Sequence, residues 1–183
     1  KYKEDDWNNY VEALGAEELF QKGISLLEKD ISKAASYFLK AADIGLPEAQ
    51  AVLGKMYYDG FHFKKDYKKS ASYFKLAAEQ GHINALFNLG YMHEVGHGVP
   101  QDPQRAAKFF LKAAKGGDAD AQARLGFFYF VGTGVLSKLV IHGSKIYANI
   151  TEKSENPNKD DLVVIESLSS GVNKYRSSWR ENF

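Results

Sequence analysis

The sequence predicts an all-α fold, an α-solenoid of about three stacked antiparallel helix pairs with a C-terminal cap that lacks the repeat. Three features carry this prediction. A period of 36 residues runs through most of the chain, each period holds two segments of helical periodicity, and glycine separates these segments. Self-similarity at a fixed period of this length is typical of helical repeat arrays, in which neighbouring units bury a shared core.

The period is marked by short motifs that return in one register. Each motif recurs at steps of 36 residues. Leu-Gly begins at positions 53, 89 and 125, and Ala-Ala begins at 41, 77 and 113. A single aspartate recurs at positions 30, 66 and 102. Residues 46–81 and 82–117 share eleven identities in 36 aligned positions, which chance does not explain. The chain therefore repeats one unit of supersecondary structure.

The first half of the unit at residues 82–117 predicts a helix. Ala85, Leu89 and Met92 lie at helical spacing and form its apolar face. Gly90 lies inside this helix, where glycine costs about 1 kcal/mol relative to alanine. Its recurrence in the other repeats indicates a position that another helix approaches too closely for a side chain.

The second half of the same unit predicts a second helix that runs antiparallel to the first. Gly96 and Gly98 end the first helix and open a loop. Asp102 and Pro103 then mark a helix start, because the carboxylate accepts hydrogen bonds from free N–H groups and proline suits the first helical position. Alanines form the inward face, and glycine ends the helix near residue 116.

The register also sets the expected boundaries of the repeats. We expect an N-terminal capping segment at 1–15, repeats at 16–45, 46–81, 82–117 and, in part, 118–136, and a divergent cap or tail at 137–183. After Val135 the register breaks, because Lys138 stands where aspartate is expected. The segment beyond predicts a degenerate second helix built from Leu139, Val140, Ile146, Tyr147 and Ile150. Residues 162–168 fit a short helix or a strand equally well.

Composition excludes several classes of function. Lys and Arg total 24 against 23 for Asp and Glu, so the chain lacks the excess positive charge of a nucleic-acid-binding protein. It has no cysteine, which excludes disulfides, thiolate zinc sites and a thiol nucleophile, and we expect no cofactor. The apolar stretch 125–141 is shorter than the ~20 residues that span a bilayer, so we expect no membrane span.

The repeat pattern resembles a known family. It is similar to the Sel-1-like repeat, a relative of the tetratricopeptide repeat, and reads Ala-x3-Leu-Gly-x2-Tyr-x2-Gly-x-Gly-Val-x2-Asp-x4-Ala-x2-Phe-x2-Ala-Ala-x2-Gly. The similarity is full over 46–117 and partial over 16–45 and 118–136. The resemblance implies a solenoid whose concave face, lined by the first helices, binds a protein or peptide. It implies an adaptor without catalysis of its own. Repeat ends without polar caps predict either self-association or a native context within a longer array of repeats.

Within this family, one stretch resembles a particular group. Residues 87–94, Gly96, Gly98 and the pair Gln101-Asp102 are similar to the luminal adaptors of Hrd-type ubiquitin ligases, which serve endoplasmic-reticulum-associated degradation. The resemblance favours the lumen of the endoplasmic reticulum over the cytoplasm or the bacterial periplasm. The alternative is a bacterial or cytosolic scaffold of a different pathway.

A zinc-protease motif occurs in the third repeat. His93-Glu94-Val95-Gly96-His97 spells H-E-x-x-H, which needs both imidazoles one turn apart on one helix, with the glutamate as base. The repeat register places Gly96 at the end of the first helix, which puts His97 in a loop, and His93 at a core position. A metalloprotease is therefore a distant alternative, and we predict that the chain is not an enzyme and holds no metal.

Several polar and aromatic residues of the first helices are not part of the repeat pattern. Such residues are the types that dominate protein interfaces. The candidate protein-binding residues are Tyr58, Asn88, Tyr91, Glu94, Arg124, Phe127 and Phe130. Contact between adjacent repeats, or with the C-terminal segment, explains the same residues equally well.

Two further sequence features have a functional and a trivial interpretation. Asn149-Ile150-Thr151 is a glycosylation sequon, meaningful in the secretory pathway and also frequent by chance. The lysines at 64, 65, 68 and 69 form a basic cluster, which fits a solvated helix start.

Overall fold

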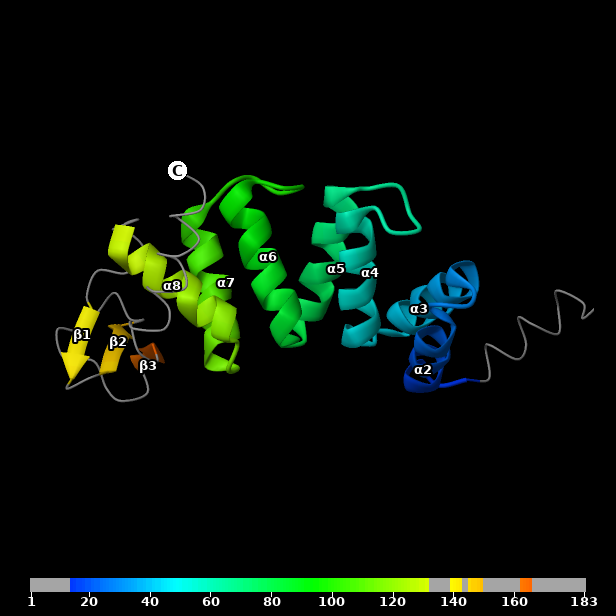
Figure 1. Ribbon diagram of the computed structural model, residues 1–183, viewed down its shortest axis with the longest axis horizontal. Helices are drawn as coiled ribbons and strands as arrows, with labels where there is room; N and C mark the ends of the chain where they lie inside the picture. Colours follow the sequence, from blue (N-terminus) through cyan, green and yellow to red (C-terminus); the bar gives the residue numbers. More distant parts are fainter. Residues whose placement is uncertain (1–13, 132–138, 143–144, 150–161, 166–183) are drawn as a thin grey trace, which may run out of the picture. The chain divides into compact units, whose positions relative to one another are not determined.

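The chain is built mainly from helices that follow the 36-residue period. The structure, a computed structural model, describes residues 14–131, 139–142, 145–149 and 162–165. These residues form seven helices and three short strands (Figure 1). The elements are α2 (Ala16–Leu26), α3 (Ile31–Ile44), α4 (Pro47–Asp59), α5 (Tyr67–Glu79), α6 (Ile83–Val95), α7 (Pro103–Lys115), α8 (Ala119–Val131), β1 (Leu139–His142), β2 (Lys145–Asn149) and β3 (Leu162–Ile165).

The fold comprises two compact units. The first contains residues 1–85 and 97–99, and the second contains residues 86–96 and 100–183. In the first unit α2 packs on α3, α3 on α4, and α4 on α5. In the second unit α7 packs on α8. The stacked helix pairs confirm the predicted solenoid of repeats, while most of the expected capping segment 1–15 lies outside the described residues.

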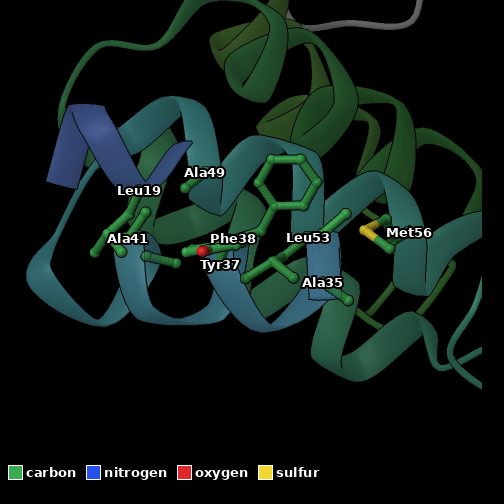
Figure 2. Packing of buried hydrophobic residues seen from close by; sticks show 10 residues of the cluster. Leu19, Ala35, Tyr37, Phe38, Ala41, Ala49, Leu53 and Met56 are labelled. Carbon is green, nitrogen blue, oxygen red and sulfur yellow. The ribbon is translucent and has the colours of Figure 1, made fainter. Parts of the chain in front are cut away.

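Small and aromatic residues alternate in the core of the first unit. Leu19, Phe38 and Leu53 are fully buried, and Ala41 and Ala49 are buried in the same cluster (Figure 2). Alanine allows two helix backbones to approach closely, and the aromatic rings fill the space that remains. The core therefore depends on the small residues of the repeat as much as on its large ones.

A phenylalanine of each second helix occupies the space left by the helical glycine of its pair. A methyl group added to Gly23 would lie 2.5 Å from the ring of Phe38, and one added to Gly54 would lie 2.8 Å from Phe74. In the second unit, a methyl group on Gly90 would lie 2.9 Å from Phe110. The predicted close approach at these glycines is therefore confirmed, and the approaching group is the ring.

Aspartates cap the second helices. The side chains of Asp30, Asp66 and Asp102 each accept a hydrogen bond from the backbone N–H three residues later, at 3.0, 3.0 and 2.9 Å. The bond from the Lys33 N–H lowers the pKa of the Asp30 carboxyl, because it favours the charged form. These contacts confirm that aspartate marks the helix start predicted at Asp102.

The C-terminal segment differs from its predicted secondary structure. β1 pairs antiparallel with β2, with Leu139 opposite Ala148, and β2 pairs antiparallel with β3, with Ile146 opposite Ile165. In the second unit β3 lies against α7 and α8. The degenerate second helix expected from Leu139, Val140, Ile146, Tyr147 and Ile150 was therefore wrong for residues 139–149, and Ile150 lies outside the described residues.

The sequence held a signal for these strands. Residues 139–149 contain β-branched and aromatic side chains, which favour a pleated sheet, and they lack the alanines of the other second helices. Gly143-Ser144 separates the two runs, and this dipeptide is typical of a hairpin connection. The undecided segment at 162–168 contains strand β3 over residues 162–165.

The apolar stretch 125–141 is divided between elements. Its beginning completes α8, and its end enters β1. Across the described part of the chain, every helix is too short or too polar to cross a membrane.

The contact between Gly54 and Phe74 gives a stability prediction. Gly54→Ala should lower the free energy of unfolding by about 1–2 kcal/mol, because overpacking against the buried ring outweighs the gain in helix propensity. Chemical denaturation followed by circular dichroism measures this change. In a Phe74→Leu background the same substitution should cost less, since leucine leaves room for the methyl group. An equal cost in both backgrounds would contradict the packing explanation.

Candidate functional site

The predicted binding residues lie on the first helices of three repeats. Tyr58 lies near the end of α4 in the first unit. The other six are in the second unit, with Asn88, Tyr91 and Glu94 on α6 and Arg124, Phe127 and Phe130 on α8. The side chain of Phe130 lies outside the described part of the structure.

Tyr91, Glu94 and Arg124 form one cluster. One guanidinium nitrogen of Arg124 donates hydrogen bonds to both carboxylate oxygens of Glu94, at 2.8 Å to Oε1 and 3.0 Å to Oε2. The guanidinium carbon lies 5.4 Å from the centre of the Tyr91 ring, within cation–π distance. The cluster joins α6 to α8, so it is a contact between adjacent repeats.

The ion pair is largely but not fully withdrawn from solvent. The side chain of Arg124 is 27% exposed and that of Glu94 is 18% exposed. Burial raises the pKa of the Glu94 carboxyl above its ordinary value, and the charge and hydrogen bonds of Arg124 oppose that rise. Desolvation of a buried ion pair can exceed the attraction within it, so Arg124 compensates only part of the cost of burying Glu94.

The remaining residues of this cluster border the core. Asn88 and Phe127 are half-buried, as is Tyr91. Their neighbours Leu89 and Phe128 are buried. The predicted residues therefore form a strip along the edge of the core, here called the first-helix strip, which is defined by Asn88, Tyr91, Glu94, Arg124 and Phe127.

Tyr58 takes part in a different cluster, together with two residues that the sequence did not single out as binding residues. Its hydroxyl lies 2.9 Å from Nδ1 of His97, and its ring lies 5.0 Å from that of Tyr67. The rings of Tyr67 and His97 stack with their centres 4.4 Å apart. A side chain on Gly98 would clash with the backbone of Tyr67. Tyr58 therefore helps to hold loop residues 97–99 against α4 and α5.

The H-E-x-x-H motif has no zinc-binding geometry. α6 ends at Val95, and Gly96 has a φ of 79°, so His97 does not continue the helix. The ring of His93 is buried, stacks on Phe109 at 5.6 Å, and has Nδ1 3.2 Å from the carbonyl oxygen of Pro100. Over the ranges that the structure covers, no group of three or more histidine or acidic side chains is placed to hold a metal ion.

The other sequence features have simple positions in the structure. Asn149 is the last residue of β2, and the rest of the sequon lies outside the described residues. All four lysines of the basic cluster are exposed. The ammonium group of Lys69 lies over the ring of Tyr57 at 5.2 Å.

Comparison with known proteins identifies the repeat. The family model of the Sel1 repeat matches four successive segments, residues 12–46, 47–82, 83–118 and 119–139. Together these segments cover well over half of the chain. Among curated proteins, none matches the chain significantly.

Solved structures of bacterial proteins share the fold. A Sel1 repeat protein from Oxalobacter formigenes is 33% identical with a TM-score of 0.62, and the match covers 66% of this chain and 51% of that protein. A protective antigen of uropathogenic Escherichia coli with an SLR fold is also 33% identical with a TM-score of 0.62, with 64% of this chain and 26% of the antigen covered.

A cysteine-rich protein is similar as well. Helicobacter pylori cysteine rich protein B is 30% identical with a TM-score of 0.52, and the match covers 64% of this chain and 90% of that protein. This chain has no cysteine, so its repeats are stabilised by packing without disulfides. The chain spans about half and about a quarter of the first two relatives.

The position of His97 gives a prediction about zinc. Isothermal titration of the full chain with zinc chloride should show the same heat for the unmodified protein and for His97→Ala, because His93 and His97 do not share a helix face. His97→Ala is preferable to His93→Ala, which would disturb the core. Micromolar binding that is lost in His97→Ala would contradict this prediction and restore the metalloprotease alternative.

The Glu94–Arg124 pair gives a prediction about proton binding. The Glu94 carboxyl should titrate above 4.5, and its pKa should rise further in Arg124→Met, because both effects that lower it disappear. Carboxyl-carbon NMR across the acidic range measures both values. The folded state binds this proton more tightly than the unfolded state, because the pKa of Glu94 is raised on folding. Protonation of Glu94 therefore stabilises the fold, fully once the pH is below 4.5, and this stabilisation is lost as the pH rises through the raised pKa.

A matched variant controls for the loss of positive charge. Lys115→Met removes an exposed cation from α7 and should leave the pKa of Glu94 unchanged, because screened surface charges act weakly at a distance. A Glu94 pKa below 4.5 in the unmodified chain would show that the ion pair outweighs burial.

Proposed function

The chain belongs to the Sel1 repeat family, and from this premise we propose that it is a protein-interaction scaffold that binds a protein or extended peptide and catalyses no reaction. Sel1 repeat proteins are generally scaffolds for protein interactions. The binding surface that we propose is the first-helix strip of the second unit, with Phe130 added through the repeat register, and Tyr58 on α4 is a separate binding residue of the first unit. Binding would use aromatic anchors, with no bond made or broken.

The observation that carries this proposal is the arrangement of Tyr91 and Arg124. Tyrosine and arginine are the residue types most often found at the energetic centre of protein interfaces. Arg124 is held by Glu94 and by the face of the Tyr91 ring, so its position is fixed before any partner binds. A preorganised side chain loses little conformational entropy on binding, which favours affinity.

Packing between adjacent repeats also accounts for these residues when no other protein is bound. This structural role is compatible with a role in binding. The ion pair joins adjacent repeats, yet both side chains keep part of their surface in solvent. Asn88, Tyr91 and Phe127 are also only half-buried. A strip of this kind supports the repeat array and offers an edge to a partner.

The pathway is a separate part of the proposal. An adaptor of endoplasmic-reticulum-associated degradation follows only from the resemblance of residues 87–102 to the luminal adaptors. A scaffold of a bacterial or cytosolic pathway is the alternative. The structural relatives named above are bacterial, but each supports the fold and the repeat family rather than a pathway.

Affinity capture tests the proposed surface. The full chain and a Tyr91→Ala, Phe127→Ala variant would each be cross-linked to partners in cells of the native organism and compared by quantitative mass spectrometry. We expect the variant to recover its partners about tenfold less, because truncated interface anchors commonly cost more than 1 kcal/mol each. Recovery of a membrane ubiquitin ligase would support the degradation adaptor, and recovery of cytosolic or envelope proteins would support the alternative.

A second variant separates binding from general loss of apolar surface. Ile44→Ala with Leu76→Ala removes two exposed apolar side chains, which are 61% and 47% exposed, from the second helices α3 and α5. This control should recover partners as well as the unmodified chain. Equal recovery by all three proteins, with equal melting temperatures, would move the binding surface away from the first-helix strip.

A further inference from the structure

The loop between α4 and α5, together with the first turn of α5, presents an exposed basic and aromatic surface. Phe61 is 54% exposed, and His62, Lys64, Lys65 and Lys68 are exposed beside it in the sequence. These five residues are here called the loop surface. All of them belong to the first unit and lie outside the first-helix strip.

The loop that carries this surface is held in place by aromatic stacking. Phe63 stacks on Tyr57 with ring centres 4.6 Å apart, and Tyr57 stacks on Tyr73 at 5.7 Å. The ring of His62 meets the edge of Phe63 at 4.8 Å. One aromatic residue of the loop is thus directed into the fold, while Phe61 remains largely exposed.

Backbone hydrogen bonds close the loop at both ends. The N–H groups of Gly60 and Phe61 both donate to the carbonyl of Met56, each at 3.0 Å. The N–H of Asp66 donates to the carbonyl of Tyr57 at 2.9 Å. A loop that is fixed in this way has little backbone entropy left to lose when a partner binds, which favours binding.

The repeat does not require these residues. The positions equivalent to Lys64 and Lys65 are Pro100 and Gln101 in the next repeat, and Lys68 corresponds to Gln104. The equivalent of Phe61 is His97, which stacks on Tyr67 instead of facing solvent.

His62 is a second departure from the repeat. It has a φ of 66°, a conformation that glycine adopts at the equivalent Gly98 with a φ of 72°. Non-glycine residues in this region store backbone strain, and such strain clusters at functional sites. Histidine in place of glycine therefore adds a side chain to the loop at a cost in backbone energy.

The positive charge of the loop surface is not neutralised within the described residues. Lys64, Lys65 and Lys68 form no ion pair in that part of the chain, and Lys65 only lies over the ring of Tyr67 at 5.8 Å. The neighbouring carboxylates are already engaged, since Asp59 pairs with Lys55 at 2.6 Å and Asp66 caps α5. Among the described residues, the three lysines that follow the exposed Phe61 in the sequence therefore lack an anionic partner.

We propose that the loop surface binds an acidic segment of another protein, with Lys64, Lys65 and Lys68 facing its carboxylates and Phe61 contacting one of its apolar side chains. This site is additional to the proposed function, because it uses the α4–α5 loop with the first turn of α5, and not the first-helix strip. A single exposed ring offers one apolar contact, which suits one side chain of a peptide. Phe63, the second ring that a lipid surface would use, is stacked on Tyr57.

Fluorescence anisotropy with defined peptides tests this proposal on the full chain. The probe is a short labelled peptide of aspartates and glutamates around one central leucine. A second peptide has alanine in place of leucine, and a third has lysines in place of the acids. We expect the first to bind most tightly, the third not to bind, and the affinity of the first to fall as sodium chloride is raised from about 0.05 to 0.3 M.

Two sets of variants assign the binding to the loop surface. The affinity for the first peptide should fall at least about tenfold in a triple variant with Lys64→Glu, Lys65→Glu and Lys68→Glu, because each charge reversal replaces attraction by repulsion. The same charge change at Lys108, Lys112 and Lys115, all exposed on α7, should change its affinity less than about twofold. Phe61→Ser should lower the affinity for the leucine peptide about tenfold and the affinity for the alanine peptide much less.

Each remaining outcome overturns the proposal. No binding of the acidic leucine peptide, or equal loss in both lysine triples, would remove the loop surface as its site. Binding to phosphatidylserine vesicles that is lost in the loop triple, without peptide binding, would assign the surface to a membrane instead. The loop triple leaves Tyr91 and Phe127 intact, so failure here does not affect capture of partners by the first-helix strip.

Discussion

The contact between a helical glycine and a phenylalanine of the paired helix is the constraint on which the repeats depend. Gly54 has no side chain where the ring of Phe74 lies, and Gly90 provides the same space for Phe110. Phe74 is almost completely buried in this contact, at only 1% exposed. Because an interior at this packing density tolerates neither added methyl groups nor voids, glycine and phenylalanine must be kept together. This pairing supports the helix hairpins without any disulfide, although one of the structural relatives is cysteine-rich.

Fixed hairpins leave other positions of each repeat free to differ, and the differences lie at the edges of the core. Position 94 is glutamate where its equivalent is Tyr58, and the two side chains make unrelated contacts. Glu94 pairs with Arg124 between α6 and α8, whereas Tyr58 contacts His97 in the loop that follows α6. The same position of the repeat therefore has two different roles. Glu94 forms an ion pair between repeats of the second unit, and Tyr58 contacts a loop residue in the first unit.

The periodic part of the fold could be predicted from the sequence, because the period itself reports packing. Gly90, Asp102 and the paired alanines recur for reasons of geometry, so their roles follow from local chemistry. The contacts among the candidate binding residues were harder to predict, because Glu94 and Arg124 are 30 residues apart and no local pattern indicates that they form an ion pair. His97 and Tyr67 were missed as partners of Tyr58, although glycine at 98 was a signal of close backbone approach. The strands at 139–149 were missed because the helical register was extended into a segment whose β-branched residues favour a sheet.

A repeat protein offers a comparison within its own chain, and this comparison separates structural from functional residues. A residue that returns every 36 positions is explained by the shared hairpin, and it needs no partner. A residue that breaks the period at a cost needs a further explanation. His62 costs backbone energy where Gly98 does not, and Phe61 leaves an aromatic ring in water where His97 is stacked. Lys64, Lys65 and Lys68 follow this ring closely in the sequence, and among the described residues they form no ion pair that the hairpin would use. Interaction with another molecule is the explanation that accounts for all three departures together.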